Sequence, residues 1–169
     1  NELSANQLYI NNGNLTFTEQ AEQFGIADRG FSTAAAFCDF DKDNLVDVYI
    51  VNQPPSIPGR RGKISRTDLP GIQFSDRLYK NAGDGKFVDV TDKCGIRNFG
   101  FGLSALTGDF NDDGYDDLAI VIPGSIAGGA KGAGAVQVLY GSSSGLLIAS
   151  HQNWSQASGG IDGIPEVND

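Results

Sequence analysis

The chain has 169 residues, 40% of them hydrophobic, and a formal net charge of -9. This length and apolar content suffice for a domain with its own core and argue against disorder. Because no basic stripe offsets the acidic excess, nucleic acid is excluded as an expected partner. No apolar run approaches the ~20 residues of a membrane span. The 23 glycines and the scarcity of helical patterns predict an all-β protein with many turns.

The first predicted elements are the two strands of a hairpin, Leu8–Asn11 and Leu15–Gln20. The Asn and Gly residues between them tolerate the positive φ angles of a tight turn. After a connector, residues 32–39 predict a strand whose alanines suit a crowded, innermost position. Residues 46–51 are mostly apolar and β-branched, which is typical of a buried strand.

The same succession returns seventy residues later. Residues 6–50 align with residues 76–120 without a gap, and fifteen of the forty-five positions are identical. Self-similarity at one period indicates an internal repeat. The second copy predicts a hairpin at 78–81 and 86–90, a small-residue strand at 102–109 and an apolar strand at 118–122, and two further strands follow at 136–140 and 146–154.

Two connectors interrupt this pattern. Residues 52–75 contain four prolines, which at that density prevent a regular strand. Residues 124–134 are small and rich in glycine. The first connector also carries a basic cluster, interpreted as a solvated loop, which consists of Arg60, Arg61, Lys63 and Arg66.

A repeat of this length with four strands matches the blade of a β-propeller. A propeller closes with about four or more blades, so this chain of about two and a half should not close a ring alone. We expect it to associate with other propeller blades, supplied by a parent chain or by copies of itself in a homo-oligomer. The expected units are a half blade of outer strands with its connector at 1–30, a full blade at 31–100 that includes loop 39–47 and connector 52–75, and a second full blade at 101–169 that includes loop 109–117 and a C-terminal connector.

Acidic loops at 39–47 and 109–117 occupy the same place in both copies, between the two inner strands of a blade. Side-chain oxygens fall at loop positions 1, 3, 5 and 9, and the carbonyl of position 7 adds one more. This spacing turns successive carboxylates toward one hard cation, and calcium, which accepts about six to eight oxygens in flexible geometry, fits better than magnesium. The predicted ligands of two calcium ions, one per loop, are Asp39, Asp41, Asp43, the Leu45 carbonyl and Asp47, and Asp109, Asn111, Asp113, the Tyr115 carbonyl and Asp117.

Position 6 of each loop is Asn44 or Gly114, the residue types that most readily enter the left-handed region of a sharp turn. Other interpretations of these loops are weaker. An EF-hand needs a Glu at position 12 and flanking helices, whereas position 12 is Ile50 or Ile120. The remaining alternative is a pair of acidic surface turns without metal. It is disfavoured because the same ligand spacing occurs in both copies of the repeat. Asp112, at position 4, should face solvent.

Cysteine and histidine argue against catalysis. Cys38 and Cys94 could form a disulfide outside the cytoplasm, but the repeat places Cys94 in a connector at the opposite end of the sheet from Cys38. We therefore expect two separate, partly buried thiols. His151 is the only histidine and has no evident nucleophilic partner, so it is interpreted as a surface residue. A pair of carboxylates, as in glycosidases, is the enzymatic alternative, but the loop carboxylates suit metal binding better.

These motifs resemble FG-GAP (VCBS) repeats, the calcium-binding blades of integrin α-subunit propellers and of many bacterial surface proteins. Residues 6–108 resemble more closely the bacterial relatives of cartilage acidic protein. Asn44 replaces the usual Gly of the loop, and Phe31-Ser32 replaces Phe-Gly. The residues that carry the resemblance are Phe101-Gly102, Gly108 to Leu118, Gly134-Ala135-Val136, Tyr140-Gly141, Asp76 to Asn81 and Gly83 to Phe87.

The resemblance implies a calcium-binding propeller segment that acts in adhesion by binding a protein or glycan. The alternatives are a structural or self-assembling segment without a ligand of its own and, less favoured, part of a secreted enzyme. Calcium loops of this kind fill at extracellular or periplasmic calcium levels, so we expect a location outside the cytoplasm or at the cell surface. The chain contains no methionine, which suggests a mature or excised piece.

Overall fold

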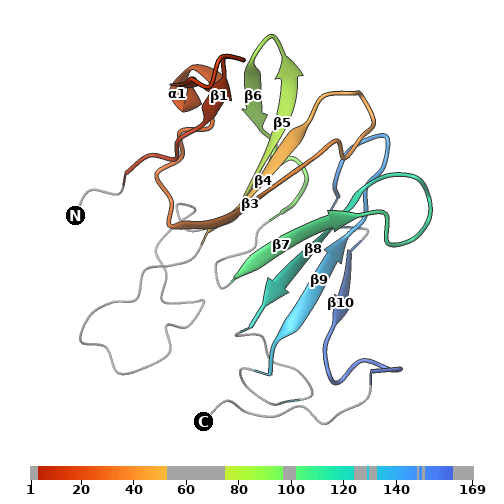
Figure 1. Ribbon diagram of the computed structural model, residues 1–169. Helices are drawn as coiled ribbons and strands as arrows, with labels where there is room; N and C mark the ends of the chain where they lie inside the picture. The colour runs from red at the N-terminus through yellow and green to blue at the C-terminus, as the bar shows by residue number, and fades with distance from the viewer. Residues whose placement is uncertain are drawn as a thin grey trace, which may run out of the picture.

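The computed structural model describes residues 4–52, 75–96, 102–123, 129, 133–147, 149 and 151–161. In these ranges the strands form three antiparallel sheets (Figure 1). A two-stranded sheet pairs β1 (Tyr9–Asn11) with β2 (Phe17–Glu19). The first four-stranded sheet consists of β3 (Ser32–Cys38), β4 (Asp47–Asn52), β5 (Arg77–Gly83) and β6 (Lys86–Asp89). The second consists of β7 (Ser104–Gly108), β8 (Asp117–Ile122), β9 (Ala135–Leu139) and β10 (His151–Trp154).

Both four-stranded sheets have the connectivity of a propeller blade. Each strand pairs with the strand that follows it in sequence, which is the order of the four antiparallel strands in a blade. The small-residue strands β3 and β7 lie side by side, as expected for the inner strands of neighbouring blades. Both acidic loops connect the first two strands of a sheet. The predicted all-β class, with propeller-type blades, is confirmed.

Two elements differ from their predictions. The connector after β2 contains a short helix, α1 (Ala21–Phe24), which ends at Gly25 in the left-handed region with φ +82°. The last strand, predicted at 146–154, begins only at His151. That prediction was wrong at its start, because Leu146 is fully buried in the core and the chain there follows the core instead of the sheet edge.

Strand β4 lies between two parts of the core, and all six of its residues are buried. Tyr49 and Val51 belong to a cluster that also contains Leu118 of β8. On the opposite face, Val48 and Ile50 pack in a second cluster with residues of α1 and its flanking connector. A strand covered on both faces needs a continuous apolar sequence, which explains the pattern that identified it.

Several predictions lie outside the described residues. They include most of connector 52–75 with its basic cluster, most of connector 124–134, and the Phe101 of the FG-GAP signature. In the part of the chain that the structure describes, no helix has the length and apolar character required to cross a bilayer.

Candidate metal centre

The first carboxylate of each acidic loop accepts hydrogen bonds from the loop backbone. Asp39 accepts hydrogen bonds from the backbone N–H groups of Asp43 (3.1 Å) and Asn44 (2.8 Å). Asp109 makes the same pair of contacts, with Asp113 (3.2 Å) and Gly114 (2.8 Å). The repeat in sequence is therefore a repeat in geometry, and both loops are held in a tight turn by their own position-1 side chain.

Two residues of each loop adopt left-handed backbone conformations. At position 6, Asn44 has φ +66° and Gly114 has φ +88°, which confirms the bend predicted from their residue types. At position 4, Lys42 and Asp112 also have φ +59°. Sequence reasoning missed this second bend because neither Lys nor Asp at one position demands a positive φ. Asp112 is exposed, as predicted.

The position-9 carboxylates lie at the buried end of each loop. Asp47 accepts a hydrogen bond from the backbone N–H of Asn81 (2.8 Å). Asp117, fully buried, accepts from the N–H groups of Gly141 and Phe110, both at 2.8 Å. Asp47 thus links its loop to the third strand of the first sheet, and Asp117 links its loop to the second residue after the third strand of the second sheet. Burial raises the pKa of Asp47 to about 6, although the hydrogen bond from the Asn81 N–H and the charge of Lys80 act in the opposite direction.

The strand register shows which residues of the two third strands correspond. Tyr79 pairs with Val48, and Leu139 pairs with Leu118, the equivalent residue of the second sheet. Tyr79 therefore corresponds to Leu139, and the Leu139-Tyr140 pair is displaced by one residue from the Leu78-Tyr79 pair that it resembles in sequence. Lys80 then corresponds to Tyr140, and Asn81 to Gly141.

The predicted ligands of the first loop converge. Oxygens of Asp39, Asp41 and Asp43 all lie within 4.8 Å of one another. Within the described part of the chain, Asp41 Oδ1 is buried and has no hydrogen-bond partner. Leu45, at position 7, donates its N–H to Asp43 Oδ1 at 2.9 Å. A buried carboxylate oxygen without a partner is costly unless a cation is near it.

The second loop is held more by internal hydrogen bonds. The Asn111 amide donates to Asp113 Oδ2 (2.9 Å) and accepts from the Asp113 N–H (3.1 Å). Asp113 also accepts from the Tyr115 N–H at 2.8 Å. The Tyr115 N–H and then the Asn111 amide lower the pKa of Asp113. The first loop has a carboxylate, Asp41, where this loop has the neutral Asn111.

Lys80 is a residue of this site that sequence reasoning missed. Its Nζ atom contacts Asp41 Oδ2, and it lies 2.8 Å from Asp43 Oδ2. The pKa of Asp43 is lowered, first by the hydrogen bond from Lys80 and then by that from the Leu45 N–H. The sequence shows that Lys80 precedes Asn81 on the strand expected to pair with β4. This position indicates a contact with the loop only when the register of the two strands is known.

A cavity of about 390 Å³ adjoins the first loop. Asp41, Asp47 and Lys80 form part of its wall, with Lys93 and Cys94. The connector that carries Cys94 therefore faces the loop across this cavity and does not lie at the opposite end of the sheet, so that prediction was wrong.

The two cysteines are both free thiols, as expected. Cys94 is buried in the main core cluster, against which the half-buried Cys38 packs. The Cys38 thiol donates to Asp116 Oδ2 at 2.8 Å, which links the first sheet to the second loop. Burial and this carboxylate raise the pKa of Cys38 to about 12, so its reactive thiolate is scarce at neutral pH.

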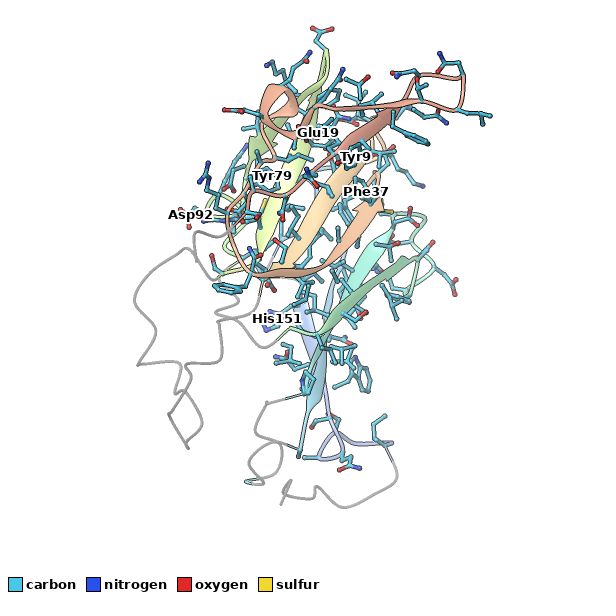
Figure 2. All side chains as sticks on the ribbon, turned by 60° about the vertical axis from the view of Figure 1, so that its left-hand side comes forward. Tyr9, Glu19, Phe37, Tyr79, Asp92 and His151 are labelled. Atoms are coloured by element: carbon cyan, nitrogen blue, oxygen red, sulfur yellow. The ribbon has the colours of Figure 1, made fainter. Side chains whose placement is uncertain are left out.

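Three further side chains are exposed on the strands. His151 is exposed on the outer strand β10 (Figure 2), in agreement with its interpretation as a surface residue. Tyr9 of β1 and Phe37 of β3 (Figure 2) are apolar side chains with 56% and 52% exposure.

Comparison with known proteins identifies the repeats. The FG-GAP repeat family matches residues 101–139, and the FG-GAP-like repeat family matches residues 1–50. Over 126 residues, or 73% of its length, the chain is 30% identical to integrin alpha-7 of Mus musculus. It spans 9% of the length of that relative.

Proposed function

Because this chain belongs to the FG-GAP repeat proteins, we propose that it is a calcium-binding propeller segment that acts in adhesion outside the cytoplasm. The observation that carries the proposal is the convergence of Asp39, Asp41 and Asp43, with a buried Asp41 oxygen that lacks a hydrogen-bond partner among the described residues. The equivalent backbone fastening of the second loop supports the same role there.

The residues present fit calcium. Every donor in the two sets is a hard oxygen of a carboxylate, amide or backbone carbonyl, which calcium prefers. We propose one ion per loop. Calcium would supply the positive charge that clustered carboxylates require, and the protein residues keep the oxygens converged through backbone hydrogen bonds. The ligands are those predicted from sequence: Asp39, Asp41, Asp43, Leu45 and Asp47, and Asp109, Asn111, Asp113, Tyr115 and Asp117.

The partners follow from the blade surfaces. Leu106 of β7 is 61% exposed and Trp154 of β10 is 41% exposed. We propose that further blades, from a parent chain or from copies of this one, cover such side chains. The units we assign are the half blade with its connector at 1–30 and the full blades at 31–100 and 101–169. If no external ligand exists, this surface favours the second candidate function, a structural or self-assembling segment.

We propose adhesion because the chain is similar to integrin alpha-7 and carries two loops that suit calcium. We assign the chain a protein or glycan ligand and no enzymatic role, because its clustered carboxylates are arranged as metal ligands. The extracellular or periplasmic location rests on the calcium concentration that such loops need.

Native mass spectrometry and calorimetric titration with calcium test whether each loop binds one ion. Two bound ions are expected, whereas a chain that takes up no calcium at millimolar concentration contradicts the proposal. Binding to arrayed glycans and matrix proteins, with and without chelator, tests adhesion. Asp113→Asn serves as a variant with an altered second loop, and calcium-dependent capture that this variant weakens is the expected result. Calcium binding without any captured ligand would favour the structural segment.

A further inference from the structure

The two acidic loops differ in the residue that approaches them from the third strand. In the first sheet this residue is Lys80, and in the second sheet the register places Tyr140 at the same position. The first loop has four carboxylates among its predicted ligands, whereas the second has three and the amide of Asn111. An ammonium group thus accompanies the loop with the additional carboxylate.

Lys80 contacts the same carboxylates that converge in the first loop. Its ammonium group touches Asp41 and Asp43, which are ligand positions 3 and 5. A lysine side chain carries a positive charge at neutral pH. A calcium ion and this ammonium would need the same oxygens.

We propose that Lys80 determines the calcium affinity of the first loop, because its ammonium group competes with the ion for Asp41 and Asp43. This inference rests on the proposed calcium-binding function. Calcium binding then requires the Lys80 side chain to swing away from the loop. The cavity beside the loop, which Lys80 helps to line, provides room for that movement.

The competition has two consequences. The ammonium group partly neutralises the first loop when calcium is scarce, so this loop should keep its fold after calcium is removed. The same contact must be broken before calcium binds, which weakens the affinity. A partly exposed ion pair costs little to break, since its side chain is 37% exposed on the lysine side, so a moderate change of about three- to fivefold in affinity is expected.

Calorimetric calcium titration of the full chain tests the proposal with Lys80→Gln. Of the two dissociation constants, one should fall about three- to fivefold and the other should stay unchanged. The melting temperature in chelator should fall. The matched control is Lys93→Gln, which removes the same charge from the wall of the same cavity and should change neither quantity.

The reciprocal change, Tyr140→Lys, keeps the test independent of the folding of one variant. It places an ammonium group beside the second loop, so one of the two dissociation constants for calcium should rise. Lys80→Gln with both constants unchanged, or with weaker binding, would overturn the inference. If the unmodified chain binds no calcium, the proposed function fails as well, and this outcome is distinguishable because it is seen without any substitution.

Discussion

Phe40 and Phe110 are the same residue at the same loop position in two copies of one repeat, yet they lie in opposite environments. Phe40 is 1% exposed in the core between the two four-stranded sheets, whereas Phe110 is 52% exposed. The local sequence is Asp-Phe in both copies. The second sheet covers the Phe40 ring, whereas the described residues leave about half of the Phe110 side chain exposed.

Calcium should have the largest effect, because it acts on both blades. At 100 times its dissociation constant, each ion should add about 2.7 kcal/mol to the free energy of unfolding. Denaturant unfolding across a calcium series measures this. If the two blades differ as proposed, chelation should destabilise the first loop less than the second. A denaturation midpoint that changes with neither calcium nor chelator would contradict the calcium sites.

Truncation of the two phenylalanines tests the comparison directly. Phe40→Ala should lower the free energy of unfolding by about 3 kcal/mol, because it opens a cavity in a packed core. Phe110→Ala should cost less than about 1 kcal/mol, since half of its ring already faces solvent. Chemical denaturation of both variants at one calcium concentration gives the difference. Equal losses would show that Phe110 is covered in solution and would break the comparison.

A smaller effect is expected in the second loop. Asp117→Asn places an amide NH₂ where a buried carboxylate accepts N–H groups from Phe110 and Gly141, and should cost about 2 kcal/mol. Asp112→Asn is the matched control, because Asp112 is exposed and Asn tolerates its φ of +59°. Its cost should stay below about 0.5 kcal/mol. Equal calcium affinity and stability in the two variants would show that the ligand register is wrong.

The smallest effect on stability, and the clearest on assembly, is expected from Leu106→Asp. Leu106 is 61% exposed, so the free energy of unfolding of the single chain should change by less than about 0.5 kcal/mol. Sedimentation velocity at high micromolar concentration should show that self-association is lost. Leu15→Asp, at a hairpin turn where the side chain is 97% exposed, is the control and should leave association intact. A monodisperse monomer before any substitution would contradict self-association.

Short-range features of this protein were predictable from sequence. The repeat identified the blades, because strand periodicity and turn residues act over a few residues. Asn44 and Gly114 indicated the bend of each loop for the same reason: the backbone preference of a residue belongs to that residue. The burial of β4 also followed, since a strand with a continuous apolar sequence must be covered on both faces.

Features that depend on partners distant in sequence were decided by the tertiary structure. The contact of Lys80 with Asp41 and Asp43 joins residues almost forty positions apart. It depends on the register between β4 and β5, which only the structure shows. Phe40 and Phe110 differ in exposure although their local sequences agree, because exposure depends on the neighbouring blade. The sequence therefore determined which residues form each loop. Packing determined which charged and apolar side chains contact those residues. The reason is that contact energies depend on the distance between side chains and not on their separation along the chain.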